Sequence, residues 1–235
     1  MTLAKQRATV LRATTGVGLT AVAGALVLAG CGSSGGGTSS SKPPSVSSLV
    51  HTTKADFRNA KSVRLTGHLR EAGNPLTLDL RMLRSGDFSG SVSLSGANFS
   101  ILRVGSKTYA YVSKSFFGFL HTTRHVPSGT CALICGKWIT LPAGTFPQLS
   151  LTSLAGKFDS HVSAPKGTHT SVTTFAGQPA YKVASKGKAA FFAKNGHHYL
   201  IGFNDQNQDI ALTFSQWNKV PPISPPPAAK VVHLG

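Results

Sequence analysis

The sequence is dominated by runs in which apolar and polar residues alternate, and this pattern restricts the chain to a fold built around a sheet. In one run, Leu76, Leu78, Leu80 and Met82 are each separated by one polar residue. Successive side chains of a strand point to opposite faces, so each run predicts a strand with one apolar face. Similar runs occupy residues 63–69, 88–94, 99–104, 108–112, 171–175, 180–185, 189–193, 198–203 and 210–214, and Trp138–Leu141 forms a shorter one.

Three segments have helical periodicity instead. Apolar residues recur at near-helical spacing over 49–60, after the candidate N-caps Ser47 and Ser48. Residues 113–120 and 146–158 predict two further helices. Together with about ten antiparallel strands, they predict an α+β domain whose helices either fill the apolar face of the sheet or leave a cavity against it. Among the turns between strands, Asn195-Gly196 is the strongest prediction of a type I′ hairpin.

The first thirty residues have the organisation of an export signal. A basic start is followed by an apolar run over residues 17–28, which is shorter than the about twenty residues needed to span a bilayer. The run ends in Leu28-Ala29-Gly30-Cys31, which resembles a bacterial lipobox, where the cysteine thiol receives a diacylglycerol. The sequence therefore predicts a signal peptide over 1–30 and a palmitate-type lipid anchor on Cys31 at the extracytoplasmic face of the cell membrane. An ordinary signal peptide with a coincidental cysteine is the alternative.

Composition divides the remaining chain into three parts. Residues 31–44 are mostly Gly and Ser and predict a flexible tether. Residues 45–219 contain no second linker and are long enough for one domain with a sizeable core. Residues 220–235 begin with a proline-rich stretch that predicts an extended tail.

The mature chain is strongly basic. Three of the 24 Lys and Arg residues and none of the seven acids precede Cys31, so 21 positive charges against seven negative ones leave +14. Such a charge attracts the protein to anionic partners, and export makes lipid headgroups or wall polymers the expected ones, with no nucleic acid partner. The charge is equally compatible with a role in solubility alone.

The two cysteines of the predicted domain, Cys131 and Cys135, are expected to form a disulfide, because an exported protein meets an oxidising environment. The alternatives are two free thiols or a zinc site, since His121 and His125 precede the pair and would supply two imidazoles. We predict no metal and no other cofactor.

Catalytic chemistry has few residues available to it. The seven acids form no close pair beside a nucleophile motif, and the formal G-x-S-x-G of residues 32–36 lies in the tether, where a nucleophile elbow cannot form. The adjacent His197 and His198 are expected to face opposite sides of a strand. The sequence therefore predicts a protein that is not an enzyme.

Several features follow one another along the chain. They are the lipobox, the tether, a helix entering a glycine-punctuated meander through Phe88-Ser89-Gly90-Ser91-Val92, the Val104-Gly105-Ser106-Lys107-Thr108-Tyr109 step and Gly136-Lys137-Trp138-Ile139. In this order they resemble the LppX/LprG-like family of actinobacterial envelope lipoproteins. The resemblance implies a curved half-barrel sheet wrapped around helices, with an apolar cavity that holds lipid or glycolipid acyl chains. It also implies lipid transport across the envelope and an envelope transport protein as a partner.

Seven residues on the apolar faces are candidates to line such a cavity, although for any one of them ordinary core packing is the more common role. They are Leu78, Leu80, Val92, Leu94, Phe99, Ile101 and Phe116. The leading hypothesis is thus a lipoprotein that binds and carries or presents an acylated lipid. The alternative is a cavity-free scaffold that binds an envelope protein or anionic polymer through its basic surface, and a hydrolase is the least supported interpretation.

Overall fold

The computed structural model describes residues 42–71, 73–146, 149–161 and 168–233. The chain divides into two units, residues 1–40 and 41–235, and the described residues all belong to the second. The predicted signal peptide and lipidation of Cys31, and most of the predicted tether, lie outside the described residues. Among the described residues, no helix combines the length and apolar character that crossing a bilayer requires.

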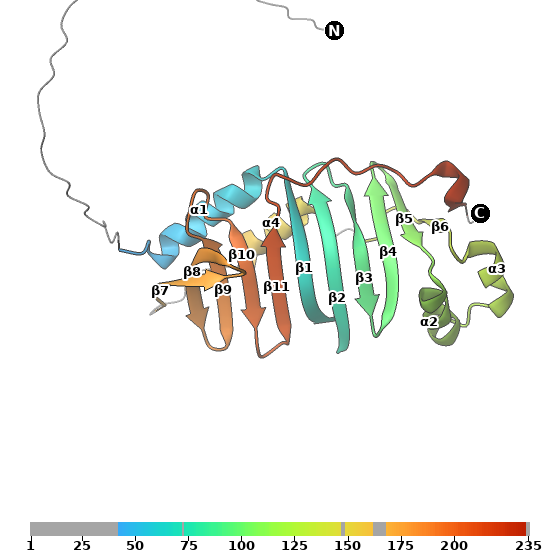
Figure 1. The fold of residues 1–235 in the computed structure, drawn as a ribbon, viewed down its shortest axis with the longest axis horizontal. Coiled ribbons are helices and arrows are strands. Elements are labelled where there is room, and N and C mark those ends of the chain that lie inside the picture. Colours follow the sequence, from blue (N-terminus) through green and yellow to red (C-terminus); the bar gives the residue numbers. More distant parts are fainter. Residues whose placement is uncertain (1–41, 72, 147–148, 162–167, 234–235) are drawn as a thin grey trace, which may run out of the picture. The chain divides into compact units, whose positions relative to one another are not determined.

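Twelve described strands form one open, curved sheet in the order β12-β6-β5-β4-β3-β2-β1-β11-β10-β9-β8-β7 (Figure 1). The strands are β1 (Ser62–Glu71), β2 (Asn74–Leu83), β3 (Phe88–Leu94), β4 (Ala97–Val104), β5 (Lys107–Tyr111), β6 (Trp138–Leu141), β7 (Thr170–Phe175), β8 (Gln178–Ser185), β9 (Lys188–Ala193), β10 (Leu200–Asp205), β11 (Ile210–Ser215) and β12 (Val231–Val232). Every neighbouring pair is antiparallel except β12 with β6. The predicted α+β fold with a curved antiparallel sheet is confirmed.

The additional strand comes from the end of the chain. Residues 220–227 have no regular secondary structure, as their prolines predict, but Val231 and Val232 then pair in parallel with Trp138 and Ile139 of β6. The C-terminal stretch therefore returns to the sheet and forms its β12 edge, running along the ends of the strands to reach it (Figure 1).

The described residues include four α-helices, one more than the three predicted. They are α1 (Val46–Asn59), α2 (Lys114–Arg124), α3 (Cys131–Ile134) and α4 (Leu151–His161), with short 3-10 turns at Ser128–Thr130 and Ala228–Lys230. The N-cap of α1 is Ser45, whose hydroxyl accepts a hydrogen bond from the Ser48 amide, so the prediction of Ser47 or Ser48 is wrong. Helix α4 also begins five residues later than predicted, at Leu151.

Helices α1 and α4 pack on one face of the sheet and share its main core. Leu49 and Phe57 of α1 and Leu151 of α4 are at most 1% exposed in this core. Arg84, in the β2–β3 turn, donates to the backbone oxygens of Phe57 (2.8 Å) and Ala60 (2.5 Å) at the C-terminal end of α1. A cation at this end is favourable to the helix dipole and satisfies carbonyls that have no partner within the helix.

The connection between β9 and β10 differs from its prediction. Asn195-Gly196 does not form a type I′ turn, because only Gly196 has positive φ and the connection spans residues 194–199. The loop is instead held on α1: the Thr53 hydroxyl donates to the backbone oxygen of His198 (2.8 Å), and His197 Nδ1 lies 2.9 Å from Asp56 Oδ1. These tertiary contacts replace the local turn preference.

We expect His197→Ala to destabilise the domain by about 1–3 kcal/mol, because the carboxylate of Asp56 is nearly buried, His197 contacts its Oδ1 atom, and its Oδ2 atom has no hydrogen-bond partner. Urea unfolding at neutral pH measures this change. His51→Ala, on an exposed position of the same helix, is the matched control and should change stability little. Equal stability of the two variants would show that the contact contributes nothing.

Gly90 is a position at which the sheet has no space for a side chain. A Cβ at Gly90 would overlap the backbone oxygen of Asp79 on β2. Its backbone has no positive φ, so the requirement for glycine there is one of space alone.

Gly90→Ala should therefore destabilise the domain by about 2–3 kcal/mol through overpacking. Thermal unfolding followed by circular dichroism measures the change. Ser89→Ala, at the neighbouring position on the opposite face of β3, is the control, and we expect its midpoint to stay close to that of the unaltered chain. A stable Gly90→Ala variant would mean that β2 and β3 can separate locally.

Candidate functional site

The register of the sheet places a continuous apolar row across eight strands, which we call the apolar strip. Each neighbouring pair in it is directly opposed on adjacent strands. In order from β8 to β4 its residues are Val183, Ala190, Phe203, Leu212, Gly67, Leu78, Val92 and Phe99. A shorter outer row, made of Leu69, Leu76 and Leu94, lies two residues further along the strands on the same face.

Exposure increases across this face with distance from the helices. The row two residues nearer the helices, which we call the covered row, contains Phe214, Leu65, Leu80 and Ile101, all at most 7% exposed. In the apolar strip, Leu78 and Val92 are also buried, at 8% and 9% exposed, whereas Val183, Ala190, Phe203, Leu212 and Phe99 are only partly buried. Helices α1 and α4 thus seal the covered row, and the apolar strip beside it keeps accessible surface.

Stacked aromatic rings continue the apolar strip at its β4 end. The Phe99 ring stacks on Phe116 of α2 with centroids 4.4 Å apart, and Phe116 stacks on Phe119 at 6.5 Å. All three side chains are half-buried. The apolar surface therefore extends from the sheet onto α2, which begins just after β5 with Ser113 as its N-cap.

The seven predicted cavity residues divide between these rows. Leu80 and Ile101 are 1% exposed in the covered row, where they act as core residues. Leu78, Val92 and Phe99 lie in the apolar strip, Leu94 in the outer row, and Phe116 on α2 beside Phe99.

Sequence reasoning missed the half of the strip that β8–β11 contribute. These strands alternate as clearly as β2–β4, but their place beside β1 depends on a pairing between residues far apart in the chain. The residues missed are Val183, Ala190, Phe203 and Leu212.

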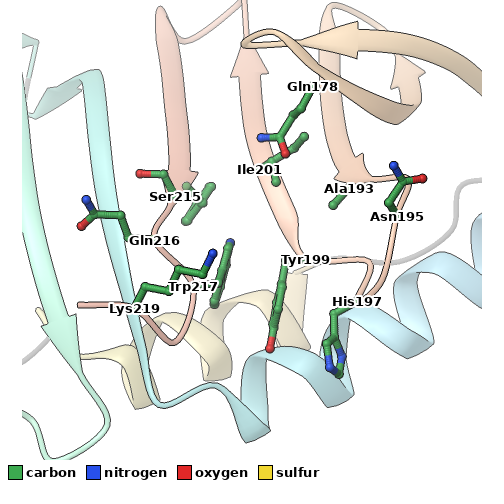
Figure 2. A pocket seen from close by; sticks show the side chains of 11 residues that line it. Gln178, Ala193, Asn195, His197, Tyr199, Ile201, Ser215, Gln216, Trp217 and Lys219 are labelled. Carbon is green, nitrogen blue, oxygen red and sulfur yellow. The ribbon is translucent and has the colours of Figure 1, made fainter. Parts of the chain in front are cut away.

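Four surface pockets among the described residues lie elsewhere, and none of the seven predicted residues lines them. One of about 380 Å³ lies between the β9–β10 loop and the chain after β11 (Figure 2). Its Tyr199 and Trp217 rings stack on each other at 4.5 Å, and His197 and Phe214 flank them at 5.2 and 6.3 Å. Because the ring faces are used within the protein, they offer no free platform to a ligand.

The opposite face of the sheet carries an ion pair between β1 and β2 in which both carboxylate oxygens take part. Arg64 donates to both carboxylate oxygens of Asp79, from Nε at 2.8 Å and from the terminal nitrogen at 2.6 Å. These hydrogen bonds, aided by the charges of Arg64 and Arg81, lower the pKa of Asp79 against a smaller opposing effect of burial. The same pair raises the pKa of Arg64.

The structure joins Cys131 and Cys135 in a disulfide, as predicted. His121 Nδ1 instead lies 2.6 Å from the backbone oxygen of Val126. Within the described part of the chain, no group of three or more His, Cys, Asp or Glu side chains is arranged to hold a metal ion.

Comparison with known proteins gives no family. No family model matches the sequence, and no curated protein is significantly similar to it. Among solved structures, an uncharacterized conserved protein from Thermus thermophilus has a TM-score of 0.31 and 11% identity, covering 80% of this chain and 98% of that one. The Pseudomonas aeruginosa MucA/MucB complex has a TM-score of 0.28 and 12% identity, covering 74% of this chain and 55% of that one. Likeness at this level assigns neither a family nor a function.

The Arg64–Asp79 pair should make a small, pH-dependent contribution to stability. Because the pKa of Asp79 is lowered by folding, this contribution is present above the ordinary value of 3.8 and is lost as pH falls through the lowered folded value. The Asp79 side chain is 40% exposed, so we expect a coupling below about 1 kcal/mol at neutral pH.

A double-mutant cycle of Asp79→Asn and Arg64→Gln, with urea unfolding from about pH 7 to about pH 2, measures this coupling. A coupling that persists undiminished at the acid end would contradict the assignment to the ionised carboxylate.

Proposed function

We propose that the domain binds the acyl part of a lipid or glycolipid along the apolar strip and carries or presents it in the cell envelope. The observation that carries the proposal is the exposure gradient on the apolar face of the sheet. The covered row of this face is buried, whereas most residues of the apolar strip keep accessible surface. In this proposal the protein is held at the membrane through acylated Cys31 and performs no covalent chemistry on its ligand.

The length of the strip favours a long, linear ligand. Seven steps of about 4.8 Å between eight neighbouring strands give roughly 34 Å. The acyl chains of one leaflet occupy about 15 Å, which is half of the roughly 30 Å hydrocarbon core of a bilayer. One extended chain would therefore fit within the strip, and a compact apolar molecule would leave most of it uncovered.

Energetics set the expected affinity. Full shelter of a sixteen-carbon chain is worth roughly 12 kcal/mol, at about 0.8 kcal/mol per methylene. A strip that covers one side of the chain supplies about half of this, before the cost of immobilising the ligand. About 6 kcal/mol corresponds to a dissociation constant on the order of 10–100 μM. Because the immobilisation cost weakens binding further, we expect a single acyl chain to bind no more tightly than this, and lipids with several chains to bind more tightly.

Titration of residues 41–235 with an anthroyloxy-labelled fatty acid tests the strip directly. We expect Phe203→Ser and Leu212→Ser each to weaken binding about five- to ten-fold, since each removes an apolar side chain from the middle of the row. Val172→Ser, which alters an exposed valine outside the strip, is the matched control and should bind as the unaltered chain does.

Native mass spectrometry with solvent extraction, on the domain isolated from a lipid-containing host, then identifies the ligand class. A stoichiometric acylated adduct that is depleted in Leu212→Ser supports the proposal. A domain that remains bare and does not bind the labelled fatty acid contradicts it, and the basic surface then becomes the place to look for a protein or polymer partner.

A further inference from the structure

Helices α2 and α3 form a lobe at the β6 end of the sheet, which we define as residues 113–136 (Figure 1). A small core of its own fixes the lobe, with Phe117 and Ile134 packed against Val112 and Ile139, all at most 8% exposed. The Cys131–Cys135 disulfide closes α3 within this lobe. The lobe therefore presents a defined surface.

This surface carries an unusual apolar side chain. Leu133 is 66% exposed, although the next residue, Ile134, is 5% exposed in the lobe core. Among the described residues, Leu133 and Val172 are the two large apolar side chains that are exposed, and Val172 lies on β7 at the opposite edge of the sheet. Half-buried Phe119 and Leu120 of α2 add apolar surface to the same lobe.

The charged residues of the lobe and of the residues beside it in the sequence all have one sign. From Val112 to Lys137 the sequence contains Lys114, Arg124, Lys137, His121 and His125 and no acidic residue. Lys114, the first residue of α2, and Lys137, which follows α3, are both exposed. Exposed apolar side chains framed by cations are the combination that binds the interface of a negatively charged bilayer.

We propose that the α2–α3 lobe docks on an anionic lipid bilayer, with Leu133 inserted among the headgroups and the surrounding cations facing their phosphates. A protein partner is disfavoured because a single large exposed side chain on a small lobe offers little area for a stable protein interface. A bilayer requires no shape complementarity and attracts the whole basic lobe.

Docking in this way would also bring the end of the apolar strip to the bilayer. The rings of Phe99, Phe116 and Phe119 lead from the strip to the surface of α2, so an acyl chain could pass between strip and bilayer along apolar side chains. This path rests on the proposed function, whereas the docking surface does not.

Co-flotation of residues 41–235, which form a compact unit of their own, with vesicles of phosphatidylcholine and phosphatidylglycerol in equal parts tests the docking. We expect binding to these vesicles at about 0.1 M salt and much weaker binding at about 1 M, where the Debye length falls from about 10 to about 3 Å. Leu133→Asp should weaken binding at least about ten-fold. The matched control Val172→Asp, at the other edge of the sheet, should change it less than about two-fold.

A second variant separates docking from folding. Lys114→Glu combined with Lys137→Glu leaves Leu133 in place and should weaken binding to the anionic vesicles at least about ten-fold, since it reverses two charges. Circular dichroism spectra and thermal midpoints equal to those of the unaltered chain establish that each variant is folded. Vesicle binding that is absent in the unaltered domain, or equal for Leu133→Asp and Val172→Asp, overturns the proposal.

The labelled fatty acid distinguishes this proposal from the proposed function. Leu133→Asp should retain binding of the fatty acid while losing the vesicles, because Leu133 lies outside the strip. If Leu212→Ser and the unaltered domain both bind vesicles but neither binds the fatty acid, the docking surface is supported and the acyl-binding function is wrong.

Discussion

The apolar face of the sheet is the constraint on which the rest of the structure depends. Twelve strands in one open layer create more apolar surface on that face than α1 and α4 cover. Where the helices lie, the covered row becomes a sealed core with Leu80 and Ile101 at 1% exposure. Where they end, the same alternation of residues leaves the apolar strip accessible. The core and the candidate site are therefore parts of one continuous apolar surface, and they differ only in whether helices cover them.

Local sequence patterns predicted most of the sheet, because a strand with one buried face is visible in the sequence as alternation of apolar and polar residues. The eleven strands before the C-terminal tail, the opening helix and α2 all correspond to predicted segments within a few residues. The same alternation identified Leu78, Val92 and Phe99 as residues of the apolar face. It could not separate them from Leu80 and Ile101, because the position of a helix over a strand is not encoded in the strand's own pattern.

Features that depend on distant residues were not predictable in this way. The Asn195-Gly196 pair has the composition of a tight hairpin, yet contacts with Thr53 and Asp56 on α1 hold the connection open. The two valines of β12 follow a proline-rich stretch that carries no strand signal, and they pair because the chain passes β6. In each case a contact between segments far apart in the sequence outweighs the local preference.

The central position of β1 and β11 has a consequence for how the molecule is made. These neighbours are the first strand and the last strand before the tail, and Arg64 pairs with Ser215 across the seam. The residues of β1 to β6 are synthesised long before those of β11. The edge of β1 that pairs with β11 therefore has no partner until residue 215 has been made. Pairings between such distant residues are slow to form. A half-sheet that formed as the chain emerged would therefore keep an unpaired edge until nearly the whole chain is available, and in this interval it would be most open to wrong partners.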